Sequence, residues 1–201
     1  MYREILIPLW DDSYFQIVFS TIILLKRPLS VTGLECLLNF RENQILSELL
    51  KIQSVLLIPD DDEKAVDIVH TSLRDFSMLF QRSGILCVES SENHLRIAIC
   101  CLQVMLRQSG QLVFETEAAK YACYYWIEHL HLTVKDTNSR YVRYDSLVEE
   151  LEIFLRQSFQ TWFNTISNTK GTDAIKGELN LLQTILSDIK VCLALVVANL
   201  H

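Results

Sequence analysis

His70 is the residue whose type and position could do the most specific chemistry. It ends the alternating stretch 66–70 and is followed by Thr71 and Ser72, which can begin a helix. Backbone N–H groups at a helix start suit an anion, and an imidazole N–H can donate to the same anion. His70 is therefore a candidate for contacting an anion. The alternative is a buried histidine hydrogen-bonded to the neighbouring helix, because one ring nitrogen can do either job.

Other reactive residue types carry weaker signals. Cys123, His129 and His131 could suggest a metal site, but at about 100° per helical residue the two histidines diverge, and Cys123 shares a face with neither. Cys100 and Cys101 diverge for the same reason, and neither thiol has an activating neighbour. No Ser/His/Asp order or paired-carboxylate pattern stands out. We therefore expect no catalytic residue, no metal ligand and no cofactor held by this chain alone.

An aromatic cluster at helical spacing lies in the second half of the chain. It could be a surface for a partner, but packing between helices is the favoured interpretation. Its members are Phe114, Tyr121, Tyr124, Tyr125 and Trp126.

The composition is typical of a compact, mainly α protein. Half of the 201 residues are hydrophobic, while five Gly and three Pro leave few turns. A sandwich of short strands needs a turn about every ten residues, whereas long helices do not. The formal net charge is -7, and acidic residues outnumber basic ones in both halves, so nucleic acid should be repelled.

The sequence shows neither a membrane segment nor a secretion signal. The apolar stretch 179–200 is interrupted by polar residues, and its clean run 191–198 is far shorter than the roughly 20 residues that span a bilayer. The N-terminus mixes charged with apolar residues and lacks a cleavage site. The six Cys lie mostly in apolar helical patterns, as free thiols in a reducing compartment would. We expect a cytoplasmic protein that contacts no membrane.

The first half of the chain begins with three helical patterns. Apolar residues at helical spacing occupy 15–25, 34–38 and 45–52. Asp12 and its neighbours can cap the first helix, and the segment 32–35 makes a capping box for the second through its Thr and Glu.

A change of periodicity follows. The apolar run 55–58 and the alternating run 66–70, joined by a polar turn, predict a β-hairpin, and a further helix continues to about residue 79. Three helices followed by a two-stranded wing is the order of a winged-helix domain. We therefore predict a winged-helix-like domain within residues 1–83.

The pattern after residue 83 predicts only helices, joined by short polar or Gly-containing segments. This second region, 84–201, is predicted to be a helical arm whose helices pack antiparallel, because the joints are short. The expected helices are roughly 94–107, 115–132, 144–168 and 174–200.

Several segments occur in an order found in one family. The run His-Thr-Ser-Leu-Arg-Asp-Phe at 70–76 is similar to a short His-x-Ser-x-x-Asp-Phe signature that follows the wing in the fungal NACHT-type STAND NTPases. Other segments resemble the helix that closes the ATPase module, the first and third winged-helix segments, and the first two helices after the wing. These are 2–6, 19–30, 46–57, 94–105 and 121–130. Beyond about residue 140 the resemblance fades.

The resemblance implies a regulatory part of a larger protein. No Gly-x-x-x-x-Gly-Lys-Ser/Thr loop is present, and no acidic strand end is available for magnesium, so the chain is not itself expected to be an enzyme. The ATPase core is expected upstream or lost, and ADP or ATP is implied for the parent protein. In related STAND proteins a winged-helix histidine approaches the β-phosphate of bound ADP, and the signature assigns His70 to that role.

The function implied is conformational. By analogy with the family, the winged helix folds against the ATPase core in the ADP state and swings away on activation, while the helical arm relays the change. The partners implied are the chain's own ATPase core or other protein domains. Fungal non-self recognition is the setting that the family suggests.

Two other functions remain open. Winged-helix domains often place their third helix in the major groove of DNA, but here Arg41 and Lys51 are balanced by Glu42 and Glu48, and the wing carries the acidic run 60–63. A purely structural helical scaffold for protein interactions would need no histidine that faces a nucleotide.

Overall fold

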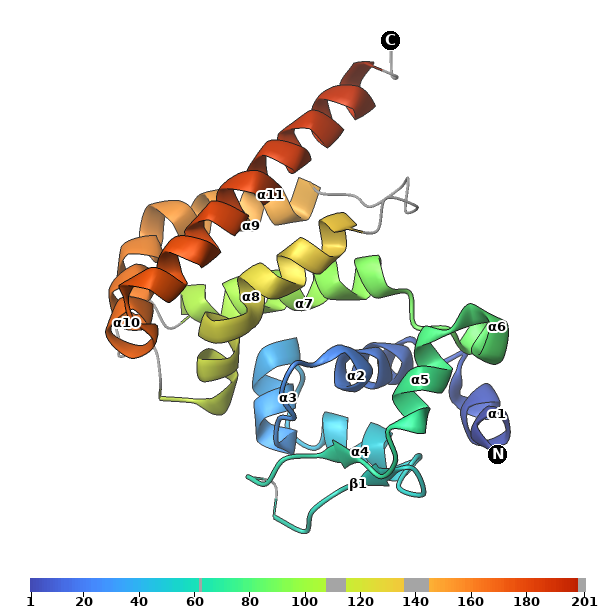
Figure 1. Ribbon diagram of the computed structural model, residues 1–201. Coiled ribbons are helices and arrows are strands. Elements are labelled where there is room, and N and C mark those ends of the chain that lie inside the picture. Colours follow the sequence, from blue (N-terminus) through green and yellow to red (C-terminus); the bar gives the residue numbers. More distant parts are fainter. Residues whose placement is uncertain (62, 108–114, 136–144, 199–201) are drawn as a thin grey trace. The chain divides into compact units, whose positions relative to one another are not determined.

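The computed structural model is mainly helical with one small antiparallel sheet, so the expectation of a mainly α chain is confirmed (Figure 1). It describes residues 1–61, 63–107, 115–135 and 145–198, with the backbone alone for 134, 135, 145, 172–174, 188 and 190–198. The chain divides into two compact units, Met1–Asn93 and His94–His201, which are described separately. Among the described residues, no helix is both long and apolar enough to cross a membrane.

The first unit opens with short helices and then the three that the sequence predicts. Asp12 caps α2 by accepting hydrogen bonds from the backbone amides of Tyr14 and Phe15, as its position predicted. The elements are α1 (Tyr2–Leu6), the 3-10 turn η1 (Ile7–Leu9), α2 (Ser13–Leu24), α3 (Val31–Leu38) and α4 (Gln44–Leu50).

The predicted capping box of the second helix is wrong. Helix α3 starts at Val31, so the cap is Ser30, whose extended backbone lets its hydroxyl accept from the amide of Gly33 at 3.0 Å. The Thr32 side chain is thereby placed outside the cap and donates to a carboxylate oxygen of Glu63 at 3.1 Å.

The predicted hairpin forms, with shorter strands than its apolar pattern suggested. Strand β1 (Leu56–Leu57) pairs antiparallel with β2 (Asp67–Ile68), Leu56 opposite Ile68. An isolated antiparallel bridge joins Ser30 to Ala65, and the amide of Val66 donates to the Leu29 carbonyl at 2.9 Å. The segment between α2 and α3 therefore lies alongside the hairpin.

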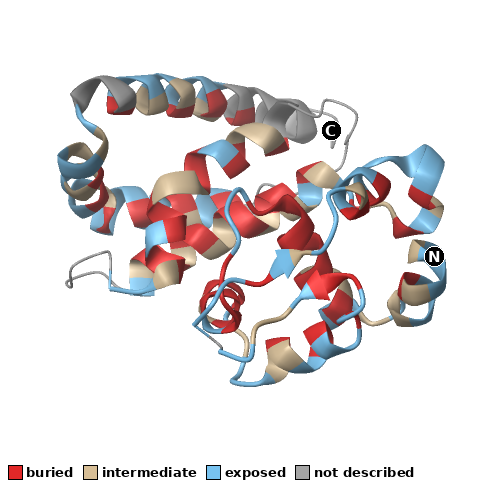
Figure 2. Ribbon diagram, turned by 60° about the horizontal axis from the view of Figure 1, so that its bottom comes forward, coloured by how far each residue is buried: buried red, intermediate tan, exposed pale blue. Residues whose placement is uncertain are grey.

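The hairpin leads into α5 (Ser72–Met78), α6 (Phe80–Ser83) and the 3-10 turn η2 (Gly84–Leu86). Buried positions gather on α2 and α3, whereas α6 is largely exposed, as Figure 2 shows by colour. The largest fully buried side chains of this unit are Leu6, Phe15, Phe19, Ile23, Leu29, Leu34, Leu37, Ile45 and Leu49.

The second unit consists of helices throughout its described residues. Helix α8 contacts both α10 and α11, and its buried face supplies Trp126 and Leu130 to the core. The helices are α7 (Ser90–Arg107), which begins just before the unit boundary, α8 (Glu117–Lys135), α9 (Asp145–Gln157), α10 (Phe159–Lys170) and α11 (Thr172–Ala198).

The single helix predicted over 144–168 is in fact two. It breaks at Ser158, whose backbone leaves the helical region, with φ -123° and ψ -12°. The break lets both halves bring rings onto Trp126: the Phe154 centroid lies 5.2 Å away and the Trp162 centroid 5.5 Å away. Burying these rings offsets the interrupted helix.

The aromatic cluster of the sequence is largely interior. Tyr121 and Trp126 are buried, which supports core packing as the role of the cluster, while Tyr124 and Tyr125 are half-buried. Phe114 lies outside the described residues.

Candidate functional site

His70 lies directly after β2 and directly before α5. Its side chain is exposed, so the alternative of a buried histidine does not describe it. Nδ1 accepts a hydrogen bond from the amide of Ser72 at 3.1 Å. A neutral imidazole that accepts at Nδ1 carries its proton on Nε2. His70 therefore presents an exposed Nε2–H donor on a ring whose other nitrogen is held by the backbone.

The backbone amides at the start of α5 do not form the expected anion site. The Ser72 amide is taken by His70 Nδ1, and the Leu73 amide donates to the carbonyl of His70 at 3.0 Å. The Asp75 amide donates to the carbonyl of Thr71 at 3.3 Å. An anion at this point would thus meet the imidazole of His70 rather than a row of free amides.

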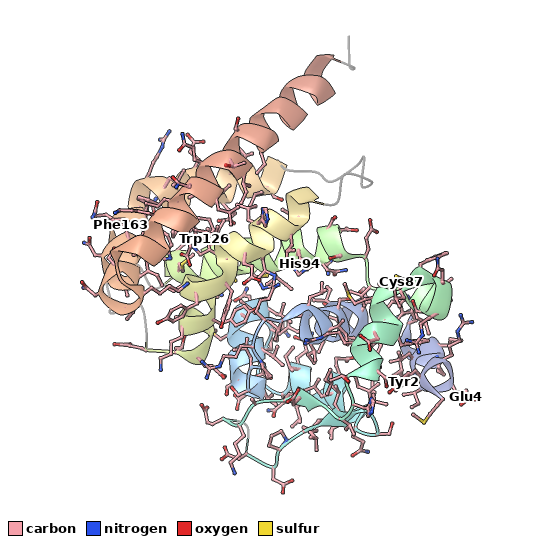
Figure 3. All side chains as sticks on the ribbon, viewed as in Figure 1. Tyr2, Glu4, Cys87, His94, Trp126 and Phe163 are labelled. Carbon is pink, nitrogen blue, oxygen red and sulfur yellow. The ribbon has the colours of Figure 1, made fainter. Side chains whose placement is uncertain are left out.

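Helix α1 is tied to the segment that carries His70. The hydroxyl of Tyr2 lies 2.7 Å from that of Ser72, and the Tyr2 ring packs against Phe76 with centroids 5.4 Å apart (Figure 3). Arg3 donates to the carbonyl of Arg82 at 3.0 Å. These contacts hold the first residues of the chain and the start of α5 together.

The lysine at the end of the helix that could read DNA is already paired with carboxylates. Lys51, which follows α4, is bonded to Glu48 at 2.6 Å and to Asp12 at 3.1 Å. The hydrogen bond to Glu48, aided by that to Asp12, raises the pKa of Lys51, and the bond from Lys51 lowers the pKa of Asp12. A lysine neutralised by two carboxylates is poorly placed to contact phosphates.

A buried polar cluster in the second unit was not foreseen from the sequence. Nδ1 of His94 lies 2.8 Å from Nδ1 of His129, and Nε2 of His129 lies 2.6 Å from the hydroxyl of Tyr121. The exposed fractions of His94, His129 and Tyr121 are 4%, 0% and 3%. Figure 3 labels His94 on α7, which faces α8. We call these three residues the histidine bridge.

The sequence indicates that Tyr121 and His129 lie close together, but it does not indicate that His94 joins them. Tyr121 and His129 are eight positions apart on α8, close enough in angle to share one side of the helix. His94 is 35 positions before His129, so its place depends on how α7 packs against α8. The spacing of residues within either helix does not indicate how α7 packs against α8.

The bridge does not have the composition of a metal centre or a catalytic triad. Within the described residues, no group of three or more His, Cys, Asp or Glu is arranged to hold a metal ion. No Asp or Glu is buried among the described residues of the second unit. The arrangement can hold and move a proton between ring nitrogens and a phenol.

Three thiols of α7 and α8 have raised pKa values. Burial raises the pKa of Cys100 to about 11 and that of Cys123 to about 12, and it raises the pKa of Cys101 as well. Because the thiolate is the reactive form, a raised pKa makes each of these cysteines a poor nucleophile.

No family model matches the chain, and searches of curated proteins and of solved structures find no significant match. The family resemblance therefore depends on the quoted segments alone.

Proposed function

We propose that this chain is the winged-helix-like and helical-arm portion of a NACHT-type STAND NTPase, where it couples nucleotide state to conformational change without catalysing hydrolysis. The order of α2, α3, α4, β1 and β2 supports the winged-helix part. The isolated Ser30–Ala65 bridge adds support, because it sets the segment between α2 and α3 beside the hairpin.

The exposed Nε2–H of His70 is the observation that carries the functional proposal. It lies at the position that the family signature assigns to the histidine near the β-phosphate of ADP, and its Nδ1 is already held by Ser72. A donor whose ring is fixed in advance loses less conformational freedom when it binds. A phosphate oxygen is an acceptor that such a donor would contact through a charge-assisted hydrogen bond.

The contacts of α1 supply a route for the coupling. Tyr2 bonds Ser72, and Ser72 bonds His70, so a shift of His70 is transmitted to α1 over two hydrogen bonds. Since α1 resembles the helix that closes the ATPase module, we propose that α1 and the start of α5 move as one piece when nucleotide is released.

The proposal is tested by the size and sequence of the protein in cells. An antibody raised against this chain should detect a polypeptide much larger than 23.3 kDa, because the ATPase core adds several hundred residues. Peptides sequenced from that polypeptide should include a Gly-x-x-x-x-Gly-Lys-Ser/Thr loop. A single species of 23.3 kDa, or a larger one without the loop, would contradict the proposal.

A further inference from the structure

The turn from α5 through α6 to η2 exposes large apolar side chains. Met78, Leu79, Phe80 and Ile85 are all exposed there. The exposed fractions of Phe80 and Ile85 are 73% and 75%, so these two side chains project almost entirely from the unit. Apolar side chains gathered so closely on a surface are typical of a site that binds another protein. We call these four residues the turn patch.

Two arginines give the turn patch a positive charge. Arg82 lies between Phe80 and Ile85 in the chain, and Arg3 of α1 donates to the Arg82 carbonyl at 3.0 Å. Both arginine side chains are exposed, and neither forms an ion pair with a carboxylate among the described residues. Arginine and aromatic side chains are enriched at the centres of protein interfaces. A partner that fits this surface brings carboxylates together with apolar side chains.

The β-hairpin offers that combination on one face. Leu57 is opposite Asp67 in the strand register, so the two side chains lie on the same face, and alternation places Val69 there as well. The exposed fractions of Leu57 and Val69 are 60% and 54%, and Asp67 is exposed too. Oδ1 of Asp67 accepts from the Ile68 amide at 2.8 Å, and its other oxygen can accept from an arginine. We call Leu57, Asp67 and Val69 the hairpin face.

The turn patch and the hairpin face do not cover each other within one chain. Both are exposed in the same compact unit, Met1–Asn93, and α5 runs between the hairpin and α6 (Figure 1). A hairpin face can therefore meet a turn patch only on a second copy. Such a contact joins different surfaces of the two copies and leaves one of each unoccupied, so it extends head to tail.

We propose that the first unit binds a second copy of this chain head to tail, the hairpin face of one copy packing on the turn patch of the next. The apolar side chains of the two surfaces are buried against each other, and Arg82 pairs with Asp67. The contact involves few side chains, and the net charge of -7 on each copy opposes it, so association is weak and depends on concentration. This inference does not depend on the proposed NTPase function.

Sedimentation velocity on the whole chain, in a reductant that keeps its cysteines free, tests the association. The sedimentation coefficient of the wild type should rise with protein concentration up to about 1 mM. Phe80→Ser and Leu57→Ser should each weaken association at least about tenfold, because each removes an apolar side chain from the contact. Leu155→Ser is the matched control, since it changes an exposed leucine of the second unit and should associate as the wild type does. A wild type that stays monomeric, or association that Phe80→Ser and Leu57→Ser leave unchanged, would overturn the proposal.

Charge reversal tests which surfaces meet. Arg82→Glu sets like charges against each other in the contact between copies, and so does Asp67→Arg, so each variant alone should associate at least about tenfold more weakly than the wild type. An equimolar mixture of the two variants should regain association, because each then finds the opposite charge on the other. A mixture that associates no better than either variant alone would exclude the pairing of the hairpin face with the turn patch.

Discussion

At His70 the two ring nitrogens have separate tasks, and this allows them to be tested separately. Nδ1 accepts from the Ser72 amide, whereas Nε2–H is the remaining donor of an exposed side chain. Asparagine can accept the same amide two residues on, as in an Asx turn, but it offers no donor in the place of Nε2. His70→Asn thus keeps the local turn and removes the outward donor, while His70→Ala removes both.

In the NTPase that we propose this chain belongs to, we expect His70→Asn and His70→Ala to release ADP about ten- to a hundredfold faster, because each loses a hydrogen bond to a charged group worth about 1.5 to 3 kcal/mol. ADP dissociation measured by stopped-flow fluorescence checks this. If only His70→Ala changed the rate, the role of His70 would be confined to the turn. If neither did, the nucleotide role would be removed.

Asp12 also combines two roles, a helix cap and a partner of Lys51. Asp12→Ala should lower the free energy of unfolding by about 1 kcal/mol through loss of the cap. Asp12→Asn, which caps equally well, should cost much less. The adjacent, exposed Asp11→Ala is the control and should be neutral in urea unfolding.

The same pair predicts a pH dependence. Lys51 lowers the pKa of Asp12 in the folded state, so the contribution of this carboxylate is present above its unfolded pKa of about 3.8 and is lost as pH falls below it. The difference in stability between wild type and Asp12→Asn should therefore shrink as pH falls below 4. A constant difference down to pH 3 would show that the charge of Asp12 contributes nothing.

At the scale of elements, the two buried tryptophans of the second unit form a natural comparison. Nε1 of Trp162 donates to the carbonyl of Cys123 at 3.1 Å, whereas Nε1 of Trp126 is buried with no partner among the described residues. Changing either to Phe removes similar apolar volume, but only Trp162→Phe also breaks a hydrogen bond. We expect Trp162→Phe to cost about 1 kcal/mol more in urea unfolding. Equal costs would mean that this bond does not hold α10 on α8.

Features set by local sequence can be predicted, whereas those set by tertiary contacts cannot. Helix α2 is predictable because the spacing of its apolar residues and the Asp12 cap agree. The break at Ser158 was missed because the apolar pattern runs through it, and only the packing of Phe154 and Trp162 on Trp126 requires it. Likewise His70 was found from a local signature, while the bridge between His94 and His129 depends on tertiary contact.

At the scale of the whole molecule, charge argues against nucleic acid. The net charge is -7, and Lys51 at the end of α4 is paired with two carboxylates. We expect the purified chain to show no binding to labelled random duplex DNA in fluorescence anisotropy at low salt, where electrostatic binding is strongest. Micromolar, salt-sensitive binding would favour the alternative of a DNA-binding winged helix.

The whole chain should also be indifferent to free nucleotide, because one exposed donor does not make a binding site. His70 offers Nε2–H, but the amides of Ser72, Leu73 and Asp75 beside it are already bonded. At about 1 mM ligand, a site with a dissociation constant of about 10 µM would add about 2.7 kcal/mol to stability, enough to move a melting curve by several degrees. We therefore expect ADP and ATP to leave the melting temperature of this chain unchanged in differential scanning fluorimetry, with His70→Ala behaving the same. A shift of several degrees that His70→Ala abolished would mean that the chain binds nucleotide without an ATPase core. The proposal that His70 only assists a nucleotide site in that core would then be wrong.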